Sequence, residues 1–561
     1  MDKLILLVLS VLVALVGLGL PAESLIRFLR GETVGSGDSL RLGAQLFKAG
    51  LVAIGLYGSA LVIAARGPGA SSRPADFDEP APARRAETLV FAGLLALAAV
   101  LRLYALDTGI WYDEMLTHVR YMPLGVGQIV STFDDANNHL LFSVLARLSI
   151  ETFGDSTWAF RLPAALFGIG SIAVLYALSR RFLSVRESLF AVALTTVSFH
   201  HIWFSQNARG YTALLFFTLL SSVLLIDALR GNRRRTWLFY ALAGALGAFT
   251  HLTMGFAAIA QFAVYLGAVA LRRPGVAAAP WRGFFYGFVP LGLLTFQLHA
   301  LILPAMFGGG LLNSGLQGRA IAWSNPLWAL MELANGLQVG FSSLGVGLAA
   351  VGVFAVGLWD LGRRSPAIVA LFLVPTVLGV TLMTSIGYTL FPRFFFFAMG
   401  FGVIILIHGA MQTGTLLGRL IGLGARADWL GAAACAAIVL LSALSLRHVH
   451  APKQAYDAAI AAIEAEEQPG DVVVTVGIAG FPFNAYFHKG WANVTTLAEL
   501  DAIRATAPRT WLVYTMPVHA QTTYPEILAE FDRDYRLVGR FAGTLNGGEI
   551  VVGVAAGGGN G

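Results

Sequence analysis

The sequence has very little charge for its length. Asp, Glu, Lys and Arg make up 12% of its 561 residues, whereas hydrophobic residues make up 57%, and the mean hydropathy is +0.70. Soluble globular proteins carry about 25% charged residues. This shortage excludes an ordinary soluble domain, and the repeated long apolar runs predict a polytopic α-helical membrane protein.

Cysteine is almost absent as well. Cys435 is the single cysteine, so no disulfide can form within the chain, and cysteine usage does not indicate a redox compartment. The N-terminal apolar run has no clear Ala-x-Ala cleavage site, which favours a retained first helix over a signal peptide. The net charge of +6 does not indicate nucleic-acid binding, because the basic residues cluster between apolar runs.

About 20 apolar residues are needed to cross a bilayer as a helix. By this measure the sequence predicts about thirteen spans, at residues 4–20, 43–65, 87–105, 161–179, 188–204, 210–229, 236–250, 253–271, 283–303, 345–360, 366–386, 394–413 and 428–446.

The loops between these spans alternate in charge. One set is short and rich in Arg, including "SRRFLSVRES", "RGNRRR" and "LRRPG", and is therefore predicted to be cytoplasmic. The other set includes two long loops, 106–160 and 304–344, which we expect on the outer face. The prediction is a multi-pass protein of a bacterial inner (plasma) membrane, with a cytoplasmic N-terminus and a periplasmic or extracellular C-terminus.

Composition divides the chain into four parts. Residues 1–65 hold two N-terminal helices, 66–86 a Pro-, Ala- and Arg-rich cytoplasmic linker, and 87–449 the main transmembrane region. From 450 to 561, short β-branched strands alternate with amphipathic helices, which predicts a small extracytoplasmic α/β domain. Scaffolding is the preferred role for this domain, with acceptor docking as the alternative.

The adjacent acids Asp113 and Glu114 follow the third predicted span, in the stretch "LDTGIWYDEMLTH". A carboxylate next to hydrocarbon is costly unless it is paired or hydrated, so such a residue indicates function. A solvated interfacial loop is the alternative for an isolated pair. This pair is not isolated, because the same outer loop contains three further polar residues: Asp134, Asp135 and His139.

Further polar residues fall at the outer ends of other predicted spans. They are Arg161, Arg209, Tyr211, His251, Tyr388 and Arg393. Arginines at one depth can neutralise a phosphate while a carboxylate removes a proton from an attacking hydroxyl. A single arginine at a span end is commonly a headgroup anchor. For Arg161, an anchor or an ion pair with Asp113 or Glu114 is an equal alternative.

Several segments together resemble the GT-C membrane glycosyltransferases of the family 39 type, which include protein O-mannosyltransferases and lipid A aminoarabinose transferases. The resemblance covers residues 87–413. It depends on the order of "WYDE", "NNHLLFSVLARL", "FGDSTWAFRLPAALFG", "FSQNARGYTALLFF", "FTHLTMG" and "FPRFFFFAMGFGVIIL". One departure is "NNHLLF", which keeps His139 but lacks the two prolines found in many relatives.

The resemblance implies a GT-C fold and a donor sugar carried on polyprenyl phosphate. It implies that Asp113 is the catalytic base of an inverting transfer to an acceptor hydroxyl, with Glu114 beside it as a contact for donor or acceptor hydroxyls. Residues expected to bind the donor phosphate or substrate are Arg209, Arg393, Arg161, His139, Tyr211, Tyr388 and His251. No cofactor is certain, but a divalent cation at Asp134 and Asp135 is an alternative. The acceptor is a lipid, a polysaccharide or a protein.

Two other functions stay open at this point. A transporter or flippase for a glycolipid also needs a polar cavity among many helices, but it should carry polar groups near the bilayer midplane or inverted repeats. An O-antigen ligase or polymerase would use Arg and His with a large outer loop, and has no need of the Asp-Glu pair.

Overall fold

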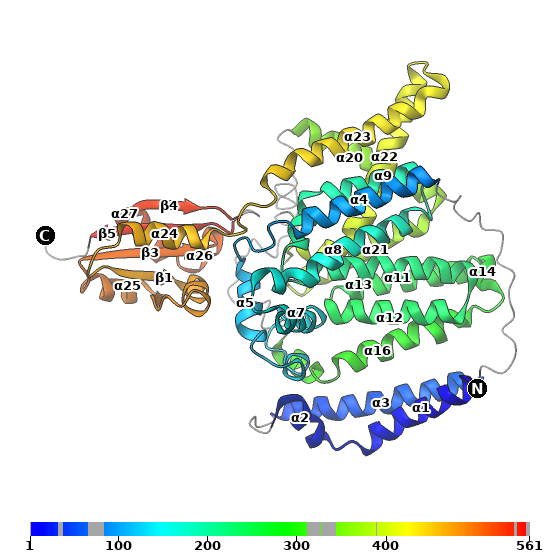
Figure 1. Ribbon diagram of the computed structural model, residues 1–561, viewed down its shortest axis with the longest axis horizontal. Helices are drawn as coiled ribbons and strands as arrows, with labels where there is room; N and C mark the ends of the chain where they lie inside the picture. The colour runs from blue at the N-terminus through cyan, green and yellow to red at the C-terminus, as the bar shows by residue number, and fades with distance from the viewer. Residues whose placement is uncertain are drawn as a thin grey trace.

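The computed structural model describes residues 2–31, 37–64, 84–310, 327, 344–388, 390–543 and 547–556. Figure 1 shows a bundle of long, roughly parallel helices with a small α/β domain at one end. The main transmembrane region is built mostly by helices whose bounds are α4 Arg85–Leu103, α8 Thr157–Ser179, α9 Val185–Val197, α10 Phe199–Ser205, α11 Tyr211–Gly231, α12 Arg234–Thr250, α13 Met254–Ala270, α16 Val289–His299, α20 Leu344–Arg364, α21 Pro366–Ser385, α22 Met399–Leu420 and α23 Ala427–Leu444.

Every predicted span corresponds to helical residues, but the count of thirteen crossings is not confirmed. Among the described residues, seven helices are long and apolar enough to cross a membrane, or up to nine if each of two bent helix pairs is one span. Several of the remaining helices are short: α12 and α13 have 17 residues each and α9 has 13. The polytopic α-helical fold class is confirmed.

The expected single span 188–204 is broken into α9 and α10. Ser198 starts the second helix, because its Oγ accepts a hydrogen bond from the His201 backbone N–H at 3.4 Å. The break leaves carbonyls at the end of α9 without helical partners, and the fully buried Arg102 of α4 donates to those of Thr195 (2.9 Å) and Thr196 (3.2 Å).

The N-terminal helices form a separate hairpin along one side of the bundle (Figure 1). α1 (Asp2–Gly19) packs along α3 (Asp38–Ala64), and the short α2 (Ala22–Arg30) turns by 93° from α1. Gly43 of α3 lies so close to the Leu301 carbonyl that a Cβ atom there would be 2.2 Å from its oxygen. This close approach fixes the hairpin against the end of α16.

The C-terminal domain has a five-stranded sheet in the order β2-β1-β3-β5-β4. The strands are β1 Val472–Val476, β2 Ala492–Val494, β3 Arg509–Thr515, β4 Arg536–Phe541 and β5 Ile550–Ala556, and the helices are α24 Tyr456–Glu466, α25 Leu497–Arg504, α26 Pro517–Thr523 and α27 Pro525–Asp534. β1 is parallel to β2 and β3, whereas β5 is antiparallel to β3 and β4. The predicted α/β domain is therefore confirmed.

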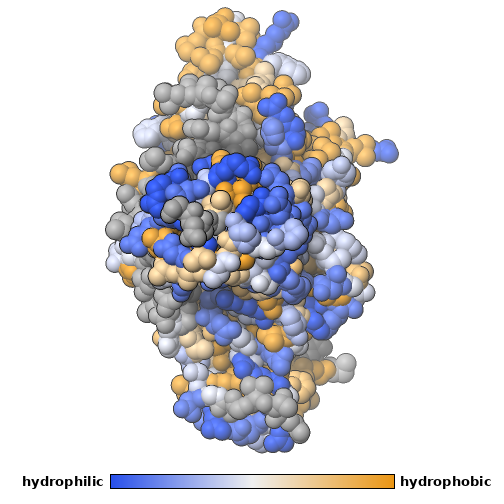
Figure 2. All heavy atoms as spheres, turned by 90° about the vertical axis from the view of Figure 1, so that its left-hand side faces the viewer, coloured by the Kyte–Doolittle hydropathy of each residue, from blue (hydrophilic) through white to orange (hydrophobic). Residues whose placement is uncertain are grey.

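This domain lies at the same end of the bundle as two short helices of the first long loop, α5 (Tyr112–Tyr121) and α7 (Leu140–Phe153) (Figure 1). One buried apolar cluster joins Ile110 and Met115 of that loop to Tyr456 and Trp511 of the domain. Seen from this end, hydrophilic side chains cover much of the surface (Figure 2).

The opposite end holds α14 (Pro274–Ala277) and the Arg-rich turns next to it, with Gly275 beside the Arg230 carbonyl. This charge asymmetry agrees with the predicted orientation, which stays a prediction together with the domain boundaries. The proposed linker 66–86 and outer loop 304–344 lie largely outside the described residues.

Candidate active site

The first helical turn of α5 sends its two adjacent acids in different directions. Trp111 precedes the helix, and the Glu114 side chain accepts a hydrogen bond from the Trp111 backbone N–H at 3.0 Å, which closes the helix N-terminus. Consecutive helical residues point about 100° apart, so Asp113 cannot share that direction. Glu114 points into the protein, whereas Asp113 lines a cavity.

Glu114 is completely buried and surrounded by donors. Arg161 binds both carboxylate oxygens, with Nε 2.8 Å from Oε1 and Nη2 2.7 Å from Oε2, and the Ala208 N–H donates to Oε1 at 2.6 Å. The Lys453 ammonium lies 3.7 Å away. Burial raises the pKa of Glu114, but the cations and donors outweigh it and lower this pKa to about 2. The carboxylate is therefore ionised and fully occupied.

This geometry corrects the expectation for two residues. Glu114 does not reach the cavity, so it cannot contact donor or acceptor hydroxyls there. Arg161 also lies outside the cavity lining, because its remaining N–H groups donate to the carbonyls of Leu106, Thr108 and Gly109. Of the alternatives given for Arg161, the structure shows the ion pair with Glu114.

Seven of the nine expected residues line one cavity of about 460 Å³. They are Asp113, His139, Arg209, Tyr211, His251, Tyr388 and Arg393. They come from α5, the start of α7, the α10–α11 junction, the end of α12 and the segment before α22, which are far apart in the sequence. The loops at one end of the bundle therefore bring the predicted polar residues together.

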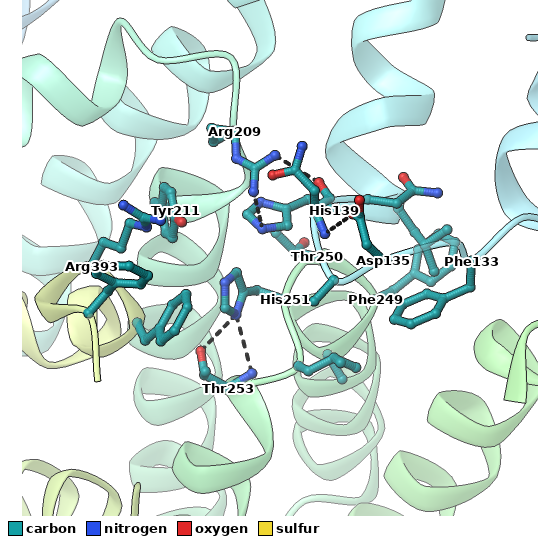
Figure 3. Close-up of a pocket in the computed structure, with 18 of the residues that line it drawn as sticks. Phe133, Asp135, His139, Arg209, Tyr211, Phe249, Thr250, His251, Thr253 and Arg393 are labelled. Atoms are coloured by element: carbon teal, nitrogen blue, oxygen red, sulfur yellow. Dashed lines mark hydrogen bonds between the residues drawn. The ribbon is translucent and has the colours of Figure 1, made fainter. Parts of the chain in front are cut away.

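Arg209 and His139 form one side of this cavity (Figure 3). The Arg209 Nη1 donates to Thr117 Oγ1 at 2.9 Å and to the Asn137 carbonyl at 2.7 Å, and Nη2 lies 3.1 Å from His139 Nε2. The Gly210 N–H donates to His139 Nδ1 at 2.8 Å. Burial and the neighbouring Arg209, His251 and Arg393 hold the pKa of His139 well below its usual range, so its ring is neutral.

A neutral imidazole has a single N–H. Because Nδ1 of His139 accepts from Gly210, the ring proton belongs on Nε2, and Nε2–H then faces the Arg209 Nη2 donor. In addition, Arg209 Nε is buried and has no hydrogen-bond partner among the described residues. Arg209 Nη2 and His139 Nε2–H therefore face each other as two donors with no acceptor between them, an arrangement that an anionic oxygen in contact with both would satisfy.

Arg393 lies across the cavity from Arg209 (Figure 3). Its Nη2 is 3.4 Å from Asp113 Oδ2, and its guanidinium carbon lies 4.1 Å from the centre of the Phe391 ring and 5.2 Å from that of Trp111. Stacking against these rings fixes the plane of the guanidinium. Its Nε likewise has no partner among the described residues.

The other expected residues form the wall between the two arginines. The His251 ring lies 4.6 Å from that of His139 and 5.5 Å from that of Tyr211, and its Nδ1 is 2.8 Å from Thr253 Oγ1. Burial, followed by the nearby Arg209 and Arg393, lowers the pKa of His251 to about 3. Both histidines are therefore neutral near pH 7.

The cavity also contains residues that sequence reasoning missed. Thr250, Phe249, Phe256, His299 and Met383 line its less polar part. They belong to ordinary apolar helix ends, so no sequence signal separates them from residues that face lipid.

The cation alternative finds no support in the arrangement of the acids. Asp134 is exposed and outside the cavity lining, whereas Asp135 lines the cavity and is paired with Arg120. In the part of the chain that the structure describes, no three His, Cys, Asp or Glu side chains are grouped to hold a metal ion.

Comparison with known families gives a match inside this region. Residues 138–296 match the sequence model of the family described as dolichyl-phosphate-mannose-protein mannosyltransferase. The resemblance to the GT-C membrane glycosyltransferases is confirmed. The matched segment includes His139, Arg161, Arg209, Tyr211 and His251.

Solved structures of GT-C glycosyltransferases also resemble the chain. ArnT from Cupriavidus metallidurans is 13% identical, with a TM-score of 0.47, and the similarity covers 84% of this chain and 98% of ArnT. An oligosaccharyltransferase from Archaeoglobus fulgidus is 10% identical, with a TM-score of 0.46 and coverage of 81% and 72%. EmbB from Mycobacterium smegmatis is 14% identical, with a TM-score of 0.41 and coverage of 73% and 45%. No curated protein sequence matches the chain.

Proposed function

We propose that the protein is an inverting glycosyltransferase that moves a sugar from a polyprenyl-phosphate donor to an acceptor hydroxyl at the outer face of a bacterial inner membrane. The observation that carries this proposal is that the Asp113 carboxylate contacts Arg393 in a cavity that Arg209 also lines. The match to the mannosyltransferase family over residues 138–296 supports the same class of donor.

The donor phosphate fits between Arg209 and Arg393. Both guanidinium groups belong to the cavity lining, with Arg209 Nη2 beside His139 Nε2 on one side and the Arg393 guanidinium, which contacts Asp113, on the other. Hydrogen bonds between guanidinium and phosphate are charge-assisted and strong in a buried site. The apolar part of the cavity, with Phe249, Phe256 and Met383, suits the first isoprene units of the lipid.

Asp113 then acts as the general base. The acceptor oxygen attacks C1 of the sugar, its proton passes to an Asp113 carboxylate oxygen, and the bond from C1 to the phosphate oxygen breaks with its electron pair remaining on the phosphate. The products are the glycoside and polyprenyl phosphate. Attack from the face opposite the leaving phosphate inverts the anomeric centre, and a phosphate leaves without protonation by an acid.

Arg393 connects binding of the donor phosphate with proton transfer to Asp113. Its Nη2 lies 3.4 Å from Asp113 Oδ2, so the guanidinium proposed to bind the phosphate also contacts the base. When donor phosphate binds, it competes for this guanidinium, which releases Asp113 toward the acceptor hydroxyl. Donor binding would in this way leave the Asp113 carboxylate free to accept the proton of the acceptor hydroxyl.

The test is transfer by purified protein from a panel of polyprenyl-phosphate sugars. Asp113→Asn should reduce turnover by about 10²–10⁴-fold, the usual contribution of a general base. Asp107→Asn, an exposed acid of the same loop, is the matched control and should retain activity.

Two outcomes would contradict the proposal. If Asp113→Asn turned over at the wild-type rate, Asp113 would not be the general base. Movement of a lipid-linked sugar across reconstituted vesicles, without cleavage of its phosphate bond by any tested acceptor, would instead favour the transporter alternative.

A further inference from the structure

The segment that connects the last transmembrane helix to the C-terminal domain enters the protein beside the helix that carries Asp113. Lys453 is 4% exposed and Gln454 is 2% exposed, although both belong to a connecting segment at the outer end of the bundle. A polar linker that only tethers two domains has no reason to bury an ammonium and an amide. Both residues contact the first turn of α5 or the residue that closes it.

Gln454 joins that turn to the sheet of the C-terminal domain. Its Oε1 accepts from the Tyr112 backbone N–H at 2.8 Å, and its Nε2 donates to the Gly548 carbonyl at 2.7 Å, just before β5. Gln454 also forms an isolated antiparallel bridge with Gly543. Tyr112 is the first residue of α5, and its N–H is one of the donors that a helix leaves without an internal partner.

Lys453 strengthens the same connection from the other side. Its ammonium donates to the Gln206 carbonyl, lies 3.7 Å from Glu114 Oε1 and is 5.3 Å from the centre of the Trp203 ring. Gln206 precedes Arg209 by three residues in the α10–α11 junction. Lys453 therefore contacts both the carboxylate that closes α5 and the segment that carries a phosphate-binding candidate.

The chain segments before α5 and before α24 pack against each other at this junction. A Cβ atom on Gly109 would lie 3.3 Å from the Pro452 Cβ and 3.4 Å from the Gln454 carbonyl oxygen. The chain before α5 and the chain before α24 are thus in close contact, so a shift of the C-terminal domain would move the start of α5.

We infer that Gln454 and Lys453 are positioning residues for Asp113. Through them, the C-terminal domain holds the start of α5 in the position that the active site needs. This inference deepens the proposed function and rests on it for the role of Asp113. Gln454 touches neither the cavity nor the proposed phosphate donors. Its loss should therefore impair the chemical step and leave donor binding in place.

The experiment compares Gln454→Met, which keeps the side-chain length but removes both hydrogen bonds, with Gln454→Glu, which keeps an acceptor for the Tyr112 N–H. Gln521→Leu, an exposed glutamine of α26, is the matched control. We expect Gln454→Met to lower kcat by 10- to 100-fold with the donor KM changed less than twofold, since a small misplacement of a reacting group has effects of this size. Gln454→Glu should recover part of kcat, because it restores the acceptor for the Tyr112 N–H but not the donor to the Gly548 carbonyl, and Gln521→Leu should match wild type.

Hydrogen exchange provides a readout that does not depend on activity. Backbone amides at the start of α5 should exchange at least tenfold faster in Gln454→Met than in wild type, Gln454→Glu or Gln521→Leu. Unchanged exchange and unchanged kcat in Gln454→Met would overturn the inference, as would a rise in donor KM that accounts for the whole defect. If wild type transfers no sugar at all, the proposed function fails, and the exchange comparison still decides whether these residues hold α5.

Discussion

Replacing Glu114 by Gln tests whether this residue anchors the active site or takes part in the chemistry. The substitution keeps the shape of the side chain but removes its charge. It leaves Arg161 and Lys453 buried without their anion, and places an amide NH₂ group against donors that now bind a carboxylate oxygen. Removing one member of a buried ion pair costs about 3–5 kcal/mol.

The expected loss is therefore about 3–5 kcal/mol of folding stability, together with reduced turnover because α5 no longer holds Asp113 in place. Thermal unfolding of the purified protein in detergent measures the first effect, and sugar transfer at a temperature where the variant stays folded measures the second. Asp113→Asn provides the contrast: it should lose turnover at near wild-type stability, because Asp113 is not part of the buried network.

A double-mutant cycle makes the assignment stricter. Arg161→Met alone leaves Glu114 as a buried anion, whereas Glu114→Gln with Arg161→Met removes both charges. We expect the double variant to be more stable than the sum of the single losses predicts, by about 1–3 kcal/mol, as for other directly coupled pairs. Strictly additive losses, or a Glu114→Gln variant as stable as wild type, would refute the anchoring role.

Two further predictions concern the cavity itself. Arg209→Met should weaken binding of polyprenyl phosphate about 10- to 100-fold, since a charge-assisted hydrogen bond contributes about 1.5–3 kcal/mol. Arg147→Met, a half-buried arginine of α7 that lies outside the cavity lining, should bind as wild type in a titration. His251 gives the second prediction, because its pKa of about 3 lies below the ordinary 6.5. As the pH falls, His251 is protonated in the unfolded chain before it is protonated in the folded protein, which favours unfolding. The contribution of neutral His251 to folding stability is therefore complete above pH 6.5 and falls by up to about 1.4 kcal/mol per pH unit toward pH 3. The melting temperature should therefore fall more steeply between pH 6.5 and 5 in wild type than in His251→Gln, and parallel curves would contradict the assignment.

The cavity residues could be predicted from the sequence because each occupies a boundary. Arg209, Tyr211, His251 and Arg393 all interrupt or adjoin an apolar run at the same predicted face, so the order of apolar runs and charged loops places them at one depth. Depth is a property of the sequence pattern alone. The direction in which a residue points around the bundle cannot be read from that pattern. For this reason the sequence groups Arg161 with the other arginines, although its side chain faces Glu114.

Other features depend on pairings between distant segments. Gln454 and Tyr112 are separated by 342 residues, and nothing in "APKQAYD" marks the glutamine as the partner of a helix N-terminus. The break at Ser198 was missed for a related reason. Its flanks are apolar enough to continue a span, and the break is stabilised by Arg102, almost a hundred residues earlier.

The two adjacent acids at the start of α5 now have separate explanations. A helix N-terminus favours negative charge, so two consecutive carboxylates are tolerated there, but their directions differ by about 100°. Glu114 accepts hydrogen bonds at both oxygens from groups that are themselves buried, and a proton taken there would break the closure of the helix. Asp113 has one cation at 3.4 Å and an open cavity beside it. A general base must gain and lose a proton without disturbing the hydrogen bonds that hold its helix in place. In this pair Glu114 makes those hydrogen bonds, so Asp113 is the residue that can transfer the proton.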